Sequence, residues 1–196
     1  STLAAAVGLY LMVMDGEAGA EIYSAATKKD QAKIIWLEAK RMVKKSPSLS
    51  RRIKCLVAEM VCEKYDAVFK PLGSDSDTLD GLNVHGGLID ELHAIKDKNI
   101  YDVIVDGTSA REQPLIFITT TAGTVRECIY DEKYDYASKV VEEVEGFTDD
   151  RLLAVIYELD SRDEWVDPTK WKKANPALGT AKNIAALTTK VNRAKQ

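Results

Sequence analysis

VHGGLID, residues 84–90, is an apolar run that ends on a carboxylate, and a second carboxylate, Glu91, follows directly. The run has the composition of a strand buried in a parallel sheet, and Gly86 and Gly87 suggest close approach of another backbone. Adjacent carboxylates repel each other and lose solvation when partly buried, so a site that keeps both must bind something positive. In an open α/β sheet, ligands bind outside the carboxyl ends of the strands. The run therefore predicts a ligand site at Asp90 and Glu91.

The two acids suggest a division of labour. Asp90 can hold Mg²⁺, directly or through water, while Glu91 orients or deprotonates an attacking water, as in nucleotide hydrolysis. This is a Walker B arrangement with a catalytic glutamate. A strand also ends in acids where they simply cap the next helix, so the sequence leaves both interpretations open.

A second apolar run, PLIFITTTAG at residues 114–123, ends in three threonines. It predicts a strand over residues 114–121 that is buried on both faces. The hydroxyls of Thr119, Thr120 and Thr121 can bind a γ-phosphate, a water molecule or the two acids, and so sense bound nucleotide. Threonine also favours strands through its branched side chain, which is the alternative explanation.

Helical and strand patterns alternate along the chain, which predicts an α/β fold with a mainly parallel sheet flanked by helices. The segment after Thr27, a plausible N-cap, has apolar residues on one face at helical spacing. Helices are expected at 1–15, 28–45, 99–109, 124–145 and from about 181. Further strands are expected at 20–26, twice within 52–72, and at 151–159, with a polar loop at 73–81.

The composition limits the class of protein. With 196 residues, 45% of them hydrophobic, the chain can build one sizeable domain, with or without a small appendage, and global disorder is excluded. A formal net charge of −4 excludes a uniformly basic surface, so a nucleic-acid contact needs a local patch. The most apolar segment, residues 3–14, is too short to span a bilayer and no basic segment precedes it, so we expect a soluble intracellular protein.

The cysteines and histidines give no metal signature. Three cysteines without C-x-x-C spacing favour reduced, structural thiols, and the histidines show no ligand spacing, so packing or surface roles are expected. These residues are Cys55, Cys62, Cys128, His85 and His93.

One side of the helix predicted at 28–45 carries a row of lysines, Lys29, Lys33, Lys40 and Lys44. Such a row can meet a phosphate backbone, and it can equally be a solvated face. The sequence does not decide between the two.

The residues that would cradle nucleotide phosphates are missing, because no G-x-x-x-x-G-K-[ST] loop occurs in the chain. The chain begins S-T-L-A-A-A, however, and a phosphate loop runs from its lysine into Ser or Thr and then into a buried helix. We therefore expect Ser1 to be the Mg²⁺-binding hydroxyl, with Thr2 beside it at the nucleotide. The first seven residues of the motif would then lie before Ser1. Plain N-capping of the first helix is the alternative for Ser1.

Taken together, these segments resemble the large terminase subunit of tailed bacteriophages, the ATP-driven motor that packages DNA, over nearly the whole chain. STLAAAVGLYLM is similar to the helix after its Walker A motif, and EIYSAATKKDQAKIIWLEAKRMV to its next strand and helix. TLDGLNVHGGLIDELHAIKD resembles its Walker B region and REQPLIFITTTAG its coupling motif. DEWVDPTKWKKANPALG resembles the segment that leaves the ATPase core. It is the most specific match, because a generic ATPase has no reason to carry W-x-x-x-N-P-x-L-G there.

The resemblance implies a P-loop NTPase fold of the ASCE or RecA-like type. Residues 1–160 would form the ATPase core without its glycine-rich loop, and residues 161–196 would begin a linker or lid. An RNase H-like nuclease domain would lie beyond Gln196. The isolated chain would then hydrolyse ATP poorly or not at all, because the phosphate cradle is absent.

The same resemblance implies roles for the candidate site residues. Ser1 and Asp90 would bind Mg²⁺, Glu91 would be the catalytic carboxylate, and the threonines at 119–121 would form the coupling motif. ATP and Mg²⁺ would be required. An arginine finger acts between subunits in such motors, and the sequence offers two candidates, Arg111 and Arg126.

The implied partners are double-stranded DNA, the terminase small subunit, the portal protein and other large-subunit copies in a ring, in the host cytoplasm and with no membrane. Two alternatives stay open. DELH fits the DExH box of a superfamily-two helicase, and TTTAG fits the helicase motif that couples hydrolysis to unwinding. A non-catalytic prophage remnant is the other.

Overall fold

The computed structural model describes residues 1–73, 81–95, 98–123 and 128–195. The chain divides into two compact units, Ser1–Tyr134 and Asp135–Gln196. The first contains the sheet, and the second contains short helices joined by irregular segments. Among the described residues, no helix has the length and apolar character needed to cross a membrane.

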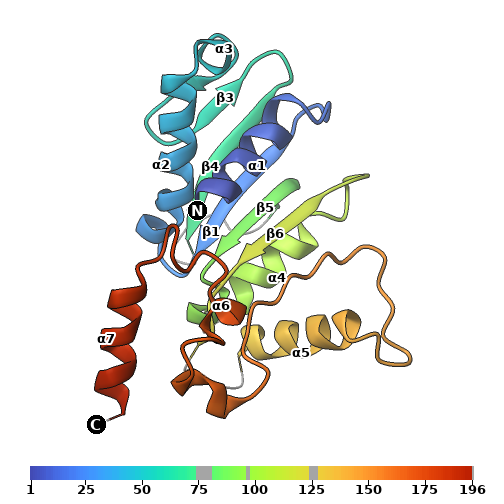
Figure 1. Ribbon diagram of the computed structural model, residues 1–196. Helices are drawn as coiled ribbons and strands as arrows, with labels where there is room; N and C mark the ends of the chain where they lie inside the picture. Colours follow the sequence, from blue (N-terminus) through green and yellow to red (C-terminus); the bar gives the residue numbers. More distant parts are fainter. Residues whose placement is uncertain (74–80, 96–97, 124–127, 196) are drawn as a thin grey trace. The chain divides into compact units, whose positions relative to one another are not determined.

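A six-stranded sheet forms the centre of the first unit, in the order β2–β3–β4–β1–β5–β6 (Figure 1). Strands β4, β1, β5 and β6 are parallel, whereas β2 and β3 extend one edge in antiparallel pairing. The predicted α/β class with a mainly parallel sheet is confirmed. The strands are β1 (Glu21–Ala26), β2 (Lys54–Cys55), β3 (Met60–Cys62), β4 (Ala67–Gly73), β5 (Val84–Asp90) and β6 (Leu115–Thr119).

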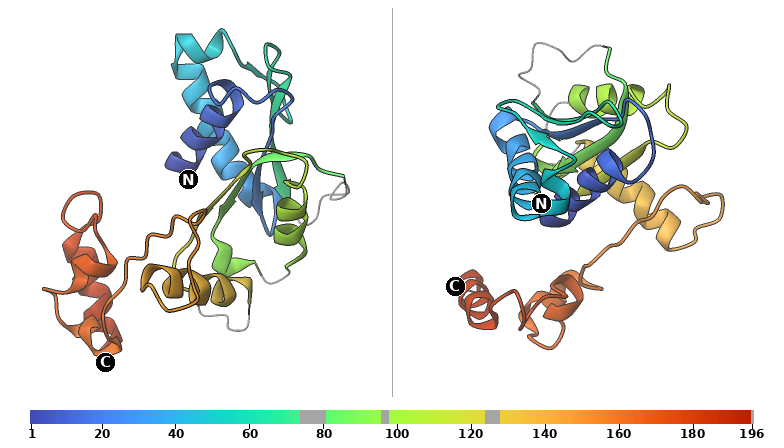
Figure 2. Two further views of the ribbon diagram at one scale, coloured as in Figure 1. Left: turned by 90° about the vertical axis from the view of Figure 1, so that its right-hand side faces the viewer. Right: turned by 90° about the horizontal axis from the view of Figure 1, so that it is seen from above.

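Helices cover both faces of the sheet. Helices α1 and α2 pack on one face and α4 on the other, as the view from above in Figure 2 shows. The helices of this unit are α1 (Thr2–Val13), α2 (Lys29–Lys45), α3 (Pro47–Ser50), the 3-10 turn η1 (Leu92–Ala94), α4 (Asn99–Asp106) and α5 (Ile129–Val141), which continues into the second unit.

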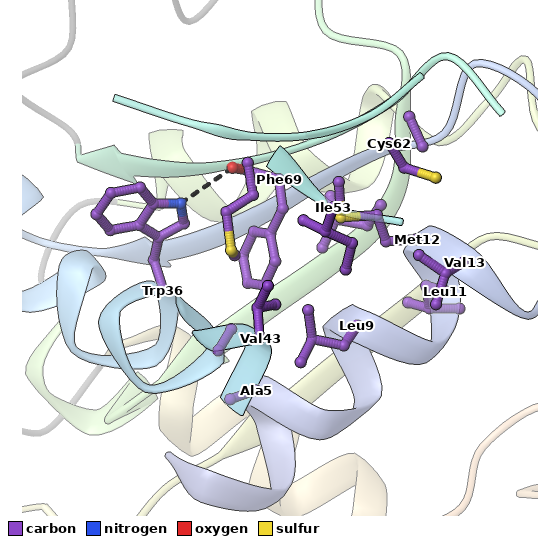
Figure 3. Packing of buried hydrophobic residues seen from close by; sticks show 14 of the residues in the cluster. Ala5, Leu9, Leu11, Met12, Val13, Trp36, Val43, Ile53, Cys62 and Phe69 are labelled. Carbon is purple, nitrogen blue, oxygen red and sulfur yellow. Dashed lines mark hydrogen bonds between the residues drawn. The ribbon is translucent and has the colours of Figure 1, made fainter. Parts of the chain in front are cut away.

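Helix α1 is apolar on most sides because it is buried against the sheet. Gly8 allows the close approach, since a Cβ there would lie 2.7 Å from Leu88 Cδ1 and 2.9 Å from Phe69 Cε1. From α2, Trp36 enters the same core and donates its Nε1–H to the Phe69 carbonyl oxygen at 3.1 Å (Figure 3). This packing fixes the start of α1, and with it Ser1, beside the end of β5.

The two glycines of β5 make room for side chains and not, as predicted, for another backbone. A Cβ on Gly86 would lie 2.7 Å from Leu11 Cδ1 of α1. A Cβ on Gly87, on the opposite face, would lie 2.5 Å from Ile104 Cγ2 of α4 and 2.8 Å from Ile116 Cδ1 of β6. Both helices therefore sit closer to β5 than an alanine would permit.

We expect alanine at Gly87 to cost about 1–3 kcal/mol of unfolding free energy, the usual range for overpacking a core. Its two neighbours, Ile104 and Ile116, are branched at Cβ and cannot turn away easily. Alanine at Gly86 should cost less, because the Leu11 side chain is flexible. Urea unfolding of the two variants tests the ranking, and equal midpoints would contradict this account of the packing.

The ends of several elements differ from those expected. Helix α2 takes Lys28 as its N-cap, with an extended backbone and no side-chain cap, so the N-cap predicted at Thr27 is wrong. The region 52–72 contains β2, β3 and most of β4, where two strands were expected. The additional strand, β2, is only two residues long. Most of the predicted polar loop, residues 74–80, lies outside the described residues, as does the start of the helix expected at 124–145.

Strand β6 is less buried than predicted. Leu115 is 39% exposed, and the other residues of the strand are partly exposed. The reason is its position, since β6 is the last strand of the described sheet and, within the residues that the structure describes, pairs with β5 alone. Four apolar residues in succession indicate a strand but do not reveal whether it has one neighbour or two.

The strand predicted at residues 151–159 is absent, because residues 152–159 adopt no regular secondary structure. Exposed and partly buried side chains alternate along most of this segment. The exposed ones include Leu153, Val155 and Tyr157, with exposed fractions of 90%, 63% and 61%. Apolar composition supplies strand propensity, whereas a strand also requires a partner for its backbone groups.

The second unit explains why the W-x-x-x-N-P-x-L-G segment has these residue types. Trp171 is buried and donates its Nε1–H to the Trp165 carbonyl oxygen at 2.8 Å, and the Asn175 amide donates to the Trp171 carbonyl oxygen at 3.0 Å. Leu178 is buried, and Gly179 has a φ of +91° that favours glycine. The helical elements of the second unit are the 3-10 turn η2 (Arg162–Val166), α6 (Trp171–Ala174) and α7 (Ile184–Ala194).

Candidate active site at the carboxyl edge of the sheet

Asp90 ends β5 and pairs with Thr119 at the end of β6, so the two apolar runs bring polar groups to the same edge. The Thr119 hydroxyl donates to Asp90 Oδ1 at 2.8 Å, and the backbone N–H of Glu91 donates to the same oxygen at 3.1 Å. The Ser1 hydroxyl donates to Asp90 Oδ2 at 2.8 Å. Both carboxylate oxygens are therefore held in one orientation.

Asp90 stays ionised at neutral pH. Burial raises the pKa of its carboxyl group, but the hydrogen bonds from the Thr119 and Ser1 hydroxyls and from the Glu91 N–H favour the charged form. Together they hold the pKa of Asp90 below its usual value. An ionised, oriented carboxylate at a strand end can accept a divalent cation.

Ser1 precedes α1, but its hydroxyl makes no cap hydrogen bond to the helix. The hydroxyl is bound to Asp90, which lies 89 positions away in the sequence. Plain N-capping, the alternative for Ser1, therefore does not describe this structure. Thr2 begins the helix and is exposed, and no hydrogen bond among the described residues joins its side chain to Asp90 or Glu91.

Glu91 adopts a left-handed backbone, with φ +56° and ψ +50°, which is uncommon for residues other than glycine. It stands before η1, yet its side chain makes no cap hydrogen bond, so plain capping does not explain this acid either. Its carboxylate is 41% exposed, and Oε2 lies 3.1 Å from His93 Nδ1 and 3.3 Å from Thr121 Oγ1. The Glu91 carboxylate thus makes a set of contacts separate from that of the Asp90 carboxylate.

His93 belongs to the site, although the sequence suggested only a packing or surface role for it. Its backbone N–H donates to Thr120 Oγ1 at 3.1 Å, and its Nδ1 lies 3.2 Å from the same oxygen. Gly123 allows this approach, since a Cβ there would lie 2.7 Å from the His93 Cβ. The sequence signal for this role was the position of His93 two residues after Glu91. A short turn brings the His93 side chain back to the Glu91 carboxylate.

Each of the three threonines contacts a different residue of the segment after β5. Thr119 binds Asp90, Thr120 binds His93, and Thr121 binds the Glu91 carboxylate. The end of β6 is therefore linked to both acids by side-chain hydrogen bonds. Strand propensity alone would not require these contacts.

Of the two arginine-finger candidates, the structure describes only Arg111. Arg111 precedes β6, at the edge of the sheet opposite Asp90, and its side chain is only 7% exposed. The guanidinium is bound to Glu17 and to backbone carbonyl oxygens, so its donors are used within the fold. Arg126 lies outside the described residues.

Comparison with protein families gives two matches. The model of the terminase large subunit ATPase domain matches residues 1–139, and the model of the terminase large subunit endonuclease domain matches residues 146–196. The second match corrects the expectation that nuclease-related sequence lies wholly beyond Gln196.

Several known proteins are similar to the chain. Protein YmfN of Escherichia coli (strain K12) is 35% identical over 117 residues, which are 59% of this chain and 25% of that protein. The terminase large subunit of Enterobacteria phage HK97 is 23% identical over 164 residues, covering 82% of this chain and 31% of that protein. The chain thus spans a quarter to a third of the length of these relatives.

Solved structures share the fold. The crystal structure of the HK97 bacteriophage large terminase aligns with a TM-score of 0.83 at 21% identity, over 98% of this chain and 40% of that one. The ATPase domain of the Thermus phage P74-26 large terminase aligns with a TM-score of 0.53 at 15% identity, over 68% of this chain and 57% of that one. None of the matches named here is a helicase. The fold is of the P-loop NTPase type, and the chain belongs to the terminase large subunit family.

Proposed function

We propose that this chain carries the Walker B half of an ATPase site, and that the protein hydrolyses ATP to move double-stranded DNA during packaging. The cluster of Ser1, Asp90 and Thr119, with Glu91 beside it, is the observation that carries the proposal. Family membership supports the reaction class. The family models and the solved structures do not favour the DELH helicase alternative.

The residues at the edge fit a magnesium ion. Mg²⁺ prefers oxygen ligands and is commonly held by one or two carboxylates, water and substrate phosphates. The Ser1 hydroxyl and the ionised Asp90 carboxylate, 2.8 Å apart, supply two such oxygens. Bound there with ATP, the ion would neutralise charge on the phosphates.

Glu91 is proposed to orient the attacking water and accept its proton. The carboxylate is half-exposed, so it can meet a water molecule, and His93 and Thr121 hold it in place. The threonines at 119–121 are proposed as the coupling motif. The hydrogen bonds of Asp90 and Glu91 to these threonines would transmit any displacement of the two acids to the end of β6.

The remaining assignments follow from the family. We propose the terminase small subunit, the portal protein and further large-subunit copies as partners, in the host cytoplasm and away from membranes. The division into an ATPase core at 1–160 and a linker or lid from 161 stays a prediction. We expect the 196-residue chain alone to turn over ATP poorly, because its sequence contains no glycine-rich phosphate loop.

The proposal predicts Mg²⁺-dependent nucleotide binding that requires Asp90. A G-x-x-x-x-G-K segment is fused directly before Ser1, and thermal unfolding is followed with ATP, with and without Mg²⁺. At 100 times the dissociation constant, ligand should stabilise the fold by about 2.7 kcal/mol. Asp90→Asn should abolish the Mg²⁺-dependent part of this stabilisation.

Asp66→Asn is the matched control, because Asp66 is exposed, lies in the turn before β4 and has a positive φ that asparagine tolerates. It should leave the stabilisation unchanged. If Asp90→Asn retains the full Mg²⁺-dependent stabilisation, the magnesium assignment is wrong.

A further inference from the structure

Four cationic side chains surround an open cavity of about 270 Å³ at the β2–β3 end of the sheet. They come from the segment after α3, from β2 and from the turn between β3 and β4, and among the described residues one acid, Glu63, lines the cavity with them. The cations are Arg51, Arg52, Lys54 and Lys64, which we call the basic cluster. The chain as a whole carries a net charge of −4, so this concentration of positive charge is local.

The basic cluster lies far from the proposed ATPase site. Tyr65, which also lines the cavity, precedes β4, and β4 runs parallel to β1 and β5. The cavity is therefore at the amino edge of these strands, whereas Asp90 is at the carboxyl edge. A seven-residue strand such as β5 spans about 20 Å, at roughly 3.3 Å per residue, so the two sites are separate. In Figure 1, α3 and β3 mark this end of the first unit.

Much of this charge is available to a partner. Arg51 and Lys64 are exposed, and Arg51 has no ion-pair partner among the described residues. Lys64 lies over the Tyr65 ring, which leaves its ammonium open on the other side. Within the described parts of the chain, Lys54 is the one member of the basic cluster that is paired with an acid, Glu63.

The charge continues onto the end of α2. Lys44 and Lys45 in its last turn are exposed, with no ion-pair partner among the described residues. Helix α3 is bound to this turn, because the Ser50 hydroxyl donates to the Val43 carbonyl oxygen at 2.6 Å. The positive surface is thus wider than the cavity itself.

The lysine row singled out in the sequence is less suited to the same task. Lys33 is paired with Asp30 at 2.8 Å. Lys40 donates to the Leu56 carbonyl oxygen at 2.6 Å and lies 4.5 Å from the centre of the Trp36 ring. Lys33 and Lys40 are therefore already engaged within the fold.

We infer that the basic cluster binds the phosphate backbone of double-stranded DNA. The inference rests on the proposed function, since it names the surface that meets the DNA which the motor moves. Arginine and lysine side chains from separate segments can neutralise several neighbouring phosphates without reading bases, as a translocating protein requires. The same surface is opposite the ATPase edge, which leaves room for DNA and nucleotide to bind together.

The test is DNA binding by the full 196-residue chain without nucleotide, so that its outcome does not depend on ATP hydrolysis. Fluorescence anisotropy with a random-sequence duplex is measured over a series of salt concentrations. Arg51→Glu combined with Lys64→Glu should raise the dissociation constant at least about tenfold at low salt and reduce the salt slope by about 2, one contact per residue.

Lys190→Glu combined with Arg193→Glu is the control, because it reverses one lysine and one arginine, as the cluster variant does, at exposed positions of α7 in the second unit. It should change the dissociation constant less than threefold. The neutral pair Arg51→Gln and Lys64→Gln replaces the reversed pair if that pair fails to fold, and it should weaken binding in the same direction. Equal losses in both charge reversals, or unchanged binding in the cluster variants, would overturn the inference. A change only in self-association, measured by sedimentation, would make the cluster a protein contact and overturn it as well.

Discussion

Glutamine at position 91 should lower ATP turnover by about 10²–10⁴-fold, the usual contribution of a positioned general base, while Mg²⁺-ATP binding stays within about twofold. The protein used carries the glycine-rich segment fused before Ser1. Glutamine has the same shape and can keep the contacts to His93 Nδ1 and Thr121 Oγ1. Glutamine cannot accept a proton from water, so only the rate of the chemical step should fall.

The separation of the two acids makes this result specific. Asp90 is bound by Ser1 and Thr119, whereas the Glu91 carboxylate is turned toward His93 by its left-handed backbone. Asp90→Asn should therefore lose Mg²⁺-dependent binding, and Glu91→Gln should lose turnover with binding retained. This split between binding and turnover distinguishes a base from a metal ligand.

Glu142→Gln serves as the control, because Glu142 is exposed beyond the end of α5 and its side chain has no hydrogen bond or ion pair among the described residues. Turnover and binding should both match the parent protein. A Glu91→Gln protein that keeps most of its turnover would mean that another group activates the water.

Strand β5 and its two acids could be predicted, because charged residues directly after an apolar run mark the end of a buried strand. The observed strand covers residues 84–90, as expected, and pairs with the second apolar run in parallel. Local pattern was sufficient here, since side chains buried on both faces leave a continuous signal. The pairing of Asp90 with Thr119 then follows from two strands that end at one edge.

Features that depend on distant neighbours could not be predicted in the same way. The exposure of β6 follows from its edge position, and residues 152–159 lack regular structure despite their apolar composition. His93 joined the site through a left-handed turn at Glu91 and a hydroxyl from Thr120, neither of which leaves a mark in a residue pattern. Sequence identified the residue types, and tertiary contacts decided their roles.

Arg111 is the clearest example of a residue whose role depends on distant neighbours. At the amino edge of the sheet, its guanidinium joins its own segment to two others. It donates to Glu17 Oε1 at 2.9 Å and to the carbonyl oxygens of Ala18, Gly19 and Asn83. The loop between α1 and β1 is thereby attached to the residues before β5. A second contact, between His85 Nε2 and Asp15 Oδ2 at 2.7 Å, holds the same loop.

Methionine at position 111 should lower the unfolding free energy of the first unit by about 3 kcal/mol, the lower end of the cost of breaking a buried ion pair. The lower end applies because Glu17 is 30% exposed and can regain water. Methionine keeps much of the volume but removes every donor, so three carbonyl oxygens lose a hydrogen-bond partner. Hydrogen exchange of the β1 and β5 amides in urea reports this unit alone.

Arg41→Met is the matched comparison, because Arg41 forms an exposed pair with Glu38 on α2 and its side chain is 68% exposed. Exposed helical pairs contribute about 0.3–0.5 kcal/mol, so this change should be several times milder than that at Arg111. Arg111→Lys should fall between them, since it keeps the charge but cannot donate to Glu17 and all three carbonyl oxygens at once. If the two methionine variants are equally stable, water replaces the guanidinium at little cost, and the loop before β1 is held chiefly by the contact between His85 and Asp15.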